Sequence, residues 1–324
     1  MRERIVEIAE EGKYLSCRDG FLVVSENGHE RGRVPLDDVG GVIATARSVT
    51  FSRSLVDALA SRGATFVLCG TNFAPSATLV PVTGHHAQGE RMRAQAAVSL
   101  PARKRAWQAI VRCKLAWQAA ALQTVGAPHE PLAALVQKVR SGDTANVEAQ
   151  GARRYWTLMF GKAFRRDPDA SGCNALLNYG YAVMRSAAAR AISAAGLHPG
   201  LGIFHGSHKN AMPLADDLME PFRCITDVVV KSQLGKGFEA PDPVTKRHLV
   251  KALYLDIDTA QGISPLTIVI QRLAASLADL FMRSAKELDV PCAPIAESLR
   301  KRIDQVVNDG DSHRIPIDVD NGDV

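Results

Sequence analysis

A change in sequence character near residue 85 constrains the fold most strongly. Before it, short apolar runs are separated by turn signals such as Asp19-Gly20 and Asn27-Gly28, a pattern typical of strands and hairpins. We expect strands at residues 4–9, 13–17, 21–25, 33–36, 41–44, 65–69 and 78–82, and a helix at about 52–61 with Ser52 or Ser54 as its N-cap. Short strands packed this densely predict a small β-sandwich or curled sheet.

After residue 87 the chain is rich in Ala, Leu, Gln, Arg and Lys, which favour helix. We expect helices at about 88–98, 102–124, 131–140, 144–166, 171–195, 212–232, 244–260, 265–288 and 294–301, separated by Pro- and Gly-containing breaks. The predicted fold class is therefore α+β. A small β-sandwich-like domain at 1–83 is followed by a linker at 84–87, a larger all-α domain at 88–305 and a loose acidic tail at 306–324.

Several classes of protein are disfavoured by the sequence. The first residues carry charge throughout and lack an apolar core, so we expect no secretory signal. The most apolar stretch, residues 175–196, is interrupted by Arg185 and Arg190, which disfavours a membrane span. The six cysteines are scattered without CxxC spacing, which disfavours a zinc ribbon or a disulfide framework. We therefore expect a cytoplasmic protein with reduced, buried thiols.

Positive charge is concentrated in the middle third of the chain. Residues 1–80 hold 9 Lys/Arg against 10 Asp/Glu, whereas residues 88–166 hold 14 Lys/Arg against 4 Asp/Glu. A localised field of this sign suits a polyanion, because each neutralised phosphate releases bound counterions. The alternative is a set of solvated helix faces. The charge pattern favours a nucleic-acid partner.

Glu148 occupies an unusual position in the predicted helix 144–166. At 100° per residue it falls on one stripe with Ala152, Tyr155, Met159 and Ala163, so it lies on the apolar face. A buried carboxylate is costly unless it is paired, protonated or bound to a metal. The alternatives to a metal ligand are a salt bridge to a buried arginine, or a stripe end that reaches solvent.

Two further segments carry candidate ligands. The segment AGLHPGLGIFHGSHKN contains His198, His205 and His208, and histidine is both a common metal ligand and a common core residue. In LADDLMEPFRCITDVVV, Asp217, Glu220 and Asp227 lie roughly opposite an apolar stripe. They form either a solvated acidic face or the lining of a groove. Asp217 and Glu220 are three residues apart, so they can converge on one cation, and Pro221 would loosen the backbone that aims Glu220.

These residues suit one kind of chemistry. Carboxylate oxygens with one imidazole fit Mg²⁺ or Mn²⁺ better than a thiolate zinc site. A hard cation in a basic groove activates a water or a DNA 3′-hydroxyl and stabilises charge on phosphorus oxygens. The sequence has no GxSxG elbow, no P-loop and no dinucleotide fingerprint.

The segments NVEAQGARRYW, LLNYGYAVMRSAAARAISAAGLHPGLGIFH and LADDLMEPFR, in this order, resemble the CRISPR adaptation integrase family, in the type II-like subtype that accompanies a single large RNA-guided effector nuclease. The resemblance covers nearly the whole chain, and its specific motifs lie between about residues 146 and 230.

The resemblance implies a metal-dependent DNA endonuclease and integrase. Such a protein joins 3′-hydroxyl ends of short duplex DNA, the new spacers, to a CRISPR repeat by transesterification. The positions that match the family's metal ligands and catalytic residues are Glu148, His205 and Glu220, with Asp217 as a further acid in or beside the site. Arg153, Arg154 and Arg223 are candidate DNA contacts.

The resemblance also implies partners. Residues 1–83 would form a homodimer, and two dimers would flank a small second adaptation subunit in a heterohexamer-type complex on double-stranded DNA, with the effector nuclease as a further candidate partner. Two other functions remain as alternatives at this point: a non-catalytic nucleic-acid-binding scaffold, and a metal-dependent hydrolase of small phosphoesters. A steep fall of activity with salt would distinguish a DNA enzyme from the latter.

Overall fold

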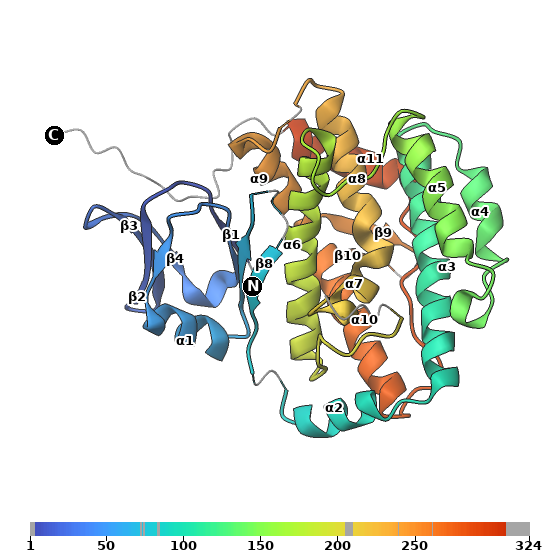
Figure 1. Cartoon of the computed structure of the whole chain (residues 1–324), viewed down its shortest axis with the longest axis horizontal. Coiled ribbons are helices and arrows are strands. Elements are labelled where there is room, and N and C mark those ends of the chain that lie inside the picture. The colour runs from blue at the N-terminus through green and yellow to red at the C-terminus, as the bar shows by residue number, and fades with distance from the viewer. Residues whose placement is uncertain are drawn as a thin grey trace.

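The structure is a computed structural model that describes residues 4–71, 73, 75–82, 85–204, 210–238, 240–260 and 262–308. A strand-rich region at one end packs against a helical region, and of the helices labelled in that region α6 and α9 lie next to the strands (Figure 1). The mixed architecture confirms the α+β prediction.

The strand-rich region contains β1 Arg4–Ile8, β2 Lys13–Arg18, β3 Phe21–Glu26, β4 His29–Pro35, β5 Val39–Ala44, β6 Thr50–Phe51, β7 Thr65–Cys69, β8 Pro75–Leu79 and helix α1 Arg53–Ser61. The described strands form two four-stranded sheets, in the orders β1-β5-β7-β8 and β4-β3-β2-β6. The predicted N-cap of α1 is confirmed at Ser52, whose hydroxyl accepts a hydrogen bond from the Leu55 amide at 3.2 Å.

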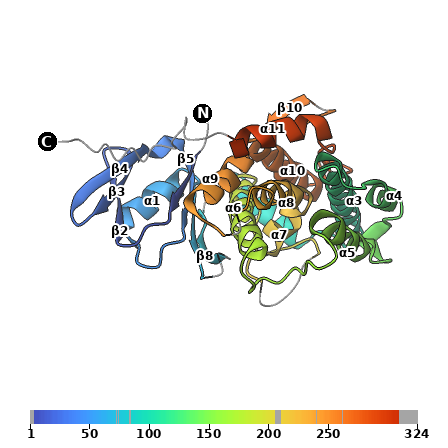
Figure 2. The same cartoon turned by 90° about the horizontal axis from the view of Figure 1, so that it is seen from above.

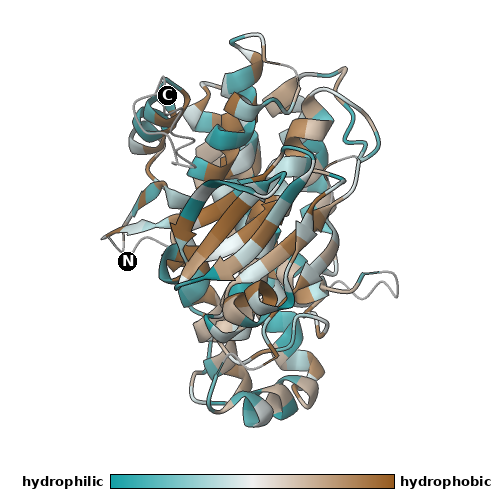
Figure 3. Cartoon of the chain, turned by 90° about the vertical axis from the view of Figure 1, so that its left-hand side faces the viewer, coloured by the Kyte–Doolittle hydropathy of each residue, from teal (hydrophilic) through white to brown (hydrophobic). Residues whose placement is uncertain are grey.

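The sheet β1-β5-β7-β8 is covered on both faces. Val42 and Phe66 face a core shared with the second sheet and α1, whereas Ile43 and Val67 face the core of the helical region. Every residue of β5 is accordingly buried, and β5 pairs in parallel with both β1 and β7. Figure 3, which views the molecule from the side of the strand-rich region, shows hydrophobic residues concentrated in the central strands and hydrophilic ones in the surrounding segments.

The helical region contains α2 Gln88–Ala96, α3 Leu100–Thr124, α4 Glu130–Val136, α5 Val147–Phe160, α6 Cys173–Ala194, α7 Pro213–Met219, α8 Arg223–Leu234, α9 Pro243–Lys251, α10 Leu266–Phe281 and α11 Ala296–Asn308. Polar contacts supplement the packing of α6 on the sheet: the Thr65 and Ser186 hydroxyls are 2.7 Å apart, and Arg190 donates to the Gly63 carbonyl. Viewed from above, α3, α4 and α5 lie at the end farthest from the strand-rich region (Figure 2).

The prediction that residues 88–305 are all helical is wrong at one place. The expected helix 244–260 ends at Lys251, and an antiparallel hairpin of β9 Asp256–Thr259 and β10 Gly262–Pro265 follows. The β-branched residues Ile257, Thr259 and Ile263, with Gly262 at φ 110°, suit a hairpin better than a helix.

Three other expectations need correction or lie outside the description. Residues 306–308 belong to α11 rather than to the tail, and residues 309–324, like residue 84 of the expected linker, lie outside the described part of the chain. The six cysteines, all among the described residues, form no disulfide bond, but only Cys113 and Cys224 are buried; Cys17, Cys69 and Cys173 are half-buried and Cys292 is exposed. None of the described helices is both long and apolar enough to cross a bilayer.

Candidate active site

Glu148 lies in the first turn of α5, and a buried aspartate fixes that turn. The Asp143 carboxylate accepts hydrogen bonds from the Val147 amide (Oδ1, 2.9 Å) and from the Glu148 amide (Oδ2, 2.9 Å). Amides in the first turn of a helix lack partners within the helix, and a carboxylate there also complements the helix dipole. Asp143 therefore determines where the backbone of Glu148 lies.

Glu220 lies where one helix gives way to another. Helix α7 ends at Met219, a 3-10 turn, η3, spans Glu220–Phe222, and α8 begins at Arg223. Pro221 lacks the amide hydrogen that a continuous α-helix would use, which accounts for the tighter turn. The expected single helix at 212–232 is therefore divided at Glu220, next to the proline that was expected to loosen the backbone there. The Glu220 side chain is buried, and its Oε1 lies 3.2 Å from Nη2 of Arg223.

The two carboxylates converge on one cation, the ammonium of Lys114 on α3. Its Nζ contacts Oε1 of Glu148 and lies 2.7 Å from Oε2 of Glu220. Burial alone would lower the pKa of Lys114, but the two carboxylates outweigh burial and raise it. Glu148 thus has the salt bridge that the sequence left open, with a lysine in place of the expected arginine. Sequence reasoning missed Lys114, although it shares an apolar stripe with Trp107, Ile110 and Trp117.

The predicted ligand His205 lies outside the described residues, as does His208, but the chain that leads to His205 is held firmly. Oδ2 of Asp217 accepts hydrogen bonds from the Ile203 amide (2.6 Å) and the Phe204 amide (3.1 Å). The Phe204 ring stacks on Trp107, with centroids 4.4 Å apart and an interplanar angle of 1°. Trp107 is two helical turns from Lys114 on the same face of α3, so Phe204, the last described residue before His205, lies beside this face.

The segment before this entry point is held by α2. The Gln95 side chain accepts from the His198 amide (2.8 Å) and donates to the carbonyls of His198 (3.0 Å) and Leu201 (2.8 Å). His198 itself is exposed and accepts from the Gly200 amide, so it shapes the turn. Sequence reasoning missed Gln95 and Asp143, because an amide or carboxylate that binds distant backbone leaves no local pattern.

The predicted DNA contacts fall into two groups. Arg153 and Arg154 are exposed on α5, in the helical turn after Glu148. Arg223 instead pairs with Glu220 and lies over the Tyr181 ring at 5.1 Å. It lines an open depression of about 400 Å³, to which Arg166, Arg185, Asn178 and Asp216 also contribute. The arginines outnumber the acids in this depression, so its surface attracts anions.

Asp227 is not part of a solvated acidic face. It is buried, and its carboxylate accepts hydrogen bonds from the hydroxyls of Tyr155 (2.7 Å) and Tyr181 (2.5 Å). Burial raises the pKa of Asp227 to about 6, against the opposing effect of the two tyrosines. Asp217 and Glu220 are buried as well. The solvated-face interpretation of this segment is therefore wrong.

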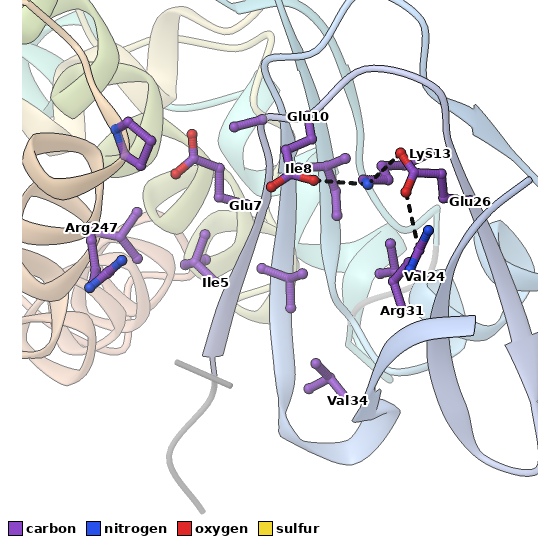
Figure 4. Close-up of a pocket in the computed structure, with 14 residues that line it drawn as sticks. Ile5, Glu7, Ile8, Glu10, Lys13, Val24, Glu26, Arg31, Val34 and Arg247 are labelled. Atoms are coloured by element: carbon purple, nitrogen blue, oxygen red, sulfur yellow. Dashed lines mark ion pairs between the residues drawn. The ribbon is translucent and has the colours of Figure 1, made fainter. Parts of the chain in front are cut away.

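A separate cavity of about 540 Å³ lies between β1, the second sheet and α9. Ion pairs occupy its rim: Lys13 lies 2.8 Å from Glu10 and 2.9 Å from Glu26, and Arg31 also pairs with Glu26 (Figure 4). None of its lining residues belongs to α3, α5 or η3.

The candidate site is therefore the carboxylate pair at Lys114. Among the described residues, no cluster of three or more His, Cys, Asp or Glu could hold a metal ion.

Comparison with known proteins identifies the family of the chain. The family model of CRISPR associated protein Cas1 matches residues 6–261. A CRISPR-associated endonuclease Cas1 from Neisseria meningitidis serogroup C is 36% identical over 88% of this chain and 94% of its own length. A Francisella tularensis subsp. novicida relative with the same description is 26% identical over 69% of this chain and 77% of its own length.

Solved structures share the fold. A casposase bound to integration product superposes with a TM-score of 0.75 at 20% identity, covering 88% of this chain and 92% of that chain. A CAS1 protein from Thermotoga maritima gives a TM-score of 0.70 at 14% identity, over 88% and 99% of the two chains. A Cas6-RT-Cas1–Cas2 complex gives 0.70 at 15% identity, over 89% and 36%. On the family match and the Neisseria relative, the chain belongs to the CRISPR-associated Cas1 family.

Proposed function

We propose that this Cas1 family member is a metal-dependent DNA endonuclease and integrase of CRISPR adaptation, which joins the 3′-hydroxyl ends of short duplex DNA to a CRISPR repeat by transesterification. The observation that carries the proposal is the convergence of Glu148 and Glu220, 72 positions apart in the sequence, on one buried ammonium. Neither a non-catalytic scaffold nor a small phosphoester hydrolase accounts for the family match.

The residues fit a divalent cation. Lys114 Nζ is a positive charge within contact distance of one oxygen from each carboxylate, so it marks a position where a cation is favoured. Glu148, Glu220 and His205 would be the ligands of Mg²⁺ or Mn²⁺, with carboxylate oxygens and one imidazole as donors. When bound, the cation would activate the attacking hydroxyl and stabilise charge on the phosphorus oxygens.

The protein side chains would orient these groups. Asp143 holds the turn that carries Glu148, and the η3 turn carries Glu220. We place Asp217 beside the ligands rather than among them, because its Oδ2 accepts the Ile203 and Phe204 amides and so directs the chain toward His205.

DNA would reach the site along positive surface. Arg153 and Arg154 are exposed next to the turn of Glu148, and most of the other Lys and Arg residues between 88 and 166 are exposed too. Arg166 and Arg185, in the depression beside Glu220, are placed to bind phosphate oxygens near the reacting bond. Arg223 would contribute through its pairing with Glu220.

The partners remain part of the proposal. A structure of a Cas6-RT-Cas1–Cas2 complex shares this fold, which supports a Cas2-like second subunit. We propose a homodimer through the strand-rich region, two such dimers on the small second subunit in a heterohexamer-type complex on double-stranded DNA, contact with the effector nuclease, and a cytoplasmic location.

The test is a strand-joining assay with the small partner subunit, a short duplex bearing free 3′-hydroxyls, and a plasmid carrying the cognate repeat, in Mn²⁺, Mg²⁺ or EDTA. Glu148→Gln, Glu220→Gln and His205→Ala should each abolish metal-dependent joining while circular dichroism stays unchanged. Glu130→Gln, an exposed acid on α4, is the matched control. Joining that persists in EDTA, or in Glu148→Gln, would refute the proposed metal centre.

A further inference from the structure

We infer that Lys114 is the resident counter-ion of the metal-free site, and that a divalent cation binds by exchange with its ammonium. The inference rests on the metal centre proposed above. Lys114 would hold Glu148 and Glu220 together before the metal binds, and its ammonium would leave the two carboxylates when the metal binds.

The position of Lys114 requires such a role. It lies in the middle of α3 with a side chain only 7% exposed, among Trp107, Ile110 and Trp117, which are fully buried. A buried ammonium is strongly unfavourable without charged partners. Its ammonium contacts one oxygen of Glu148 and one of Glu220, and Arg223 contacts the other oxygen of Glu220. Two acids and two bases therefore leave this cluster formally neutral.

The ammonium and a divalent cation would compete for the same oxygens. Mg²⁺ or Mn²⁺ binds carboxylate oxygens at about 2.1 Å, whereas Lys114 Nζ already lies 2.7 Å from Glu220 Oε2 and contacts Glu148 Oε1. Both positive charges cannot occupy the space between the two carboxylates, and at that separation they repel each other. Lys114 must therefore withdraw when the metal enters.

The exchange has a consequence for DNA. The metal-free cluster of Lys114, Glu148, Glu220 and Arg223 is neutral, and the addition of a divalent cation gives it two positive charges. The displaced ammonium remains tethered to α3 nearby. DNA phosphate would therefore be attracted more strongly to the loaded site than to the empty one, which couples DNA binding to metal binding at this position.

The experiment compares Lys114→Met with wild type and with Lys138→Met, a substitution of an exposed lysine, without DNA. In EDTA, Lys114→Met should lower the unfolding temperature by about 5 °C or more, because Glu148 and Glu220 lose their counter-ion. Isothermal titration with Mn²⁺ should give a Kd about tenfold tighter than wild type, because the competing charge is gone. Mn²⁺ should also raise the unfolding temperature more in Lys114→Met than in wild type.

A double-substitution cycle keeps the inference testable if Lys114→Met folds poorly. Lys114→Met/Glu148→Gln restores charge balance, so its loss of stability in EDTA should be smaller than the sum of the two single losses. Additive losses, or a Mn²⁺ affinity that is unchanged or weaker in Lys114→Met while wild type still joins DNA, would overturn the role of Lys114 alone. A wild type that binds no Mn²⁺ would overturn both the exchange and the proposed metal centre.

Discussion

Removal of the Asp143 carboxylate should weaken both the fold and the chemistry. In Asp143→Ala the Val147 and Glu148 amides each lose a charged acceptor at 2.9 Å in a buried setting. Loss of a helix cap costs about 0.5–2 kcal/mol, and the buried, two-amide geometry places this one near the upper limit. We expect the free energy of unfolding to fall by about 2 kcal/mol in denaturant titrations.

The effect on activity follows from which amides are released. Because the Glu148 amide is one of them, the first turn of α5 would fray and the Glu148 carboxylate would shift from its place opposite Glu220. A displacement of about 1 Å can cost up to a hundredfold in rate. We expect metal-dependent joining by Asp143→Ala to fall by about tenfold or more.

A matched control separates position from stability. Asp242 also holds the first turn of a helix, α9, with its Oδ1 accepting the Val244 amide at 2.8 Å and the Thr245 amide at 2.9 Å, and it lies outside the candidate site. Because Asp242 is only half-buried, Asp242→Ala should lose less stability, about 1 kcal/mol, and should keep the wild-type joining rate. Equal joining rates in Asp143→Ala and Asp242→Ala would refute the claim that Asp143 positions Glu148.

Three further outcomes follow from the packing. The pKa of Asp227 is raised to about 6, above its unfolded value, so its contribution to stability should fall by about 3 kcal/mol as pH rises from 4 to 6; Asp227→Asn should remove this slope in pH-dependent denaturation. A Cβ on Gly151 would lie 2.3 Å from Leu115 Cδ2, so Gly151→Ala should destabilise by about 1–3 kcal/mol, whereas Gly235→Ala, at an open helix end, should change stability by less than about 0.5 kcal/mol. Gln95→Leu breaks three hydrogen bonds to the turn that leads toward position 205, and should slow joining more than it weakens Mn²⁺ binding measured calorimetrically.

The parts of the fold that depend on local signals could be predicted from the sequence. Turn residues such as Asp19-Gly20 fixed the strand limits, and Ser52 was correctly expected to cap α1. The prediction of a helix at 244–260 was wrong because helix-forming residues at the start of this segment concealed the alternation of β-branched residues that begins at Ile257. Nor could local signals indicate that β5 and β7 pair in parallel, because that pairing depends on the crossover through α1.

The sequence allowed residues of the candidate site to be predicted one at a time, but not the pairing between them. A charged residue on an apolar stripe singled out Glu148, and the same argument applied to α3 would have singled out Lys114. The ion pair between Lys114 and Glu148, which are 34 positions apart, explains why each of these charges lies on an apolar stripe. Periodicity identifies such residues one helix at a time, but it does not say which helices pack together.

The buried acids of the α7–α8 segment show how partners distinguish a candidate ligand from a structural carboxylate. Each acid satisfies its burial differently: Asp217 through backbone amides, Asp227 through tyrosine hydroxyls, and Glu220 through the side-chain cations of Lys114 and Arg223. Amides and packed tyrosines cannot withdraw without disrupting the fold around them. A lysine ammonium on a flexible stem can withdraw, and a metal ion can replace its charge. Of these three acids, Glu220 is therefore the one whose present partners are compatible with a change to metal coordination.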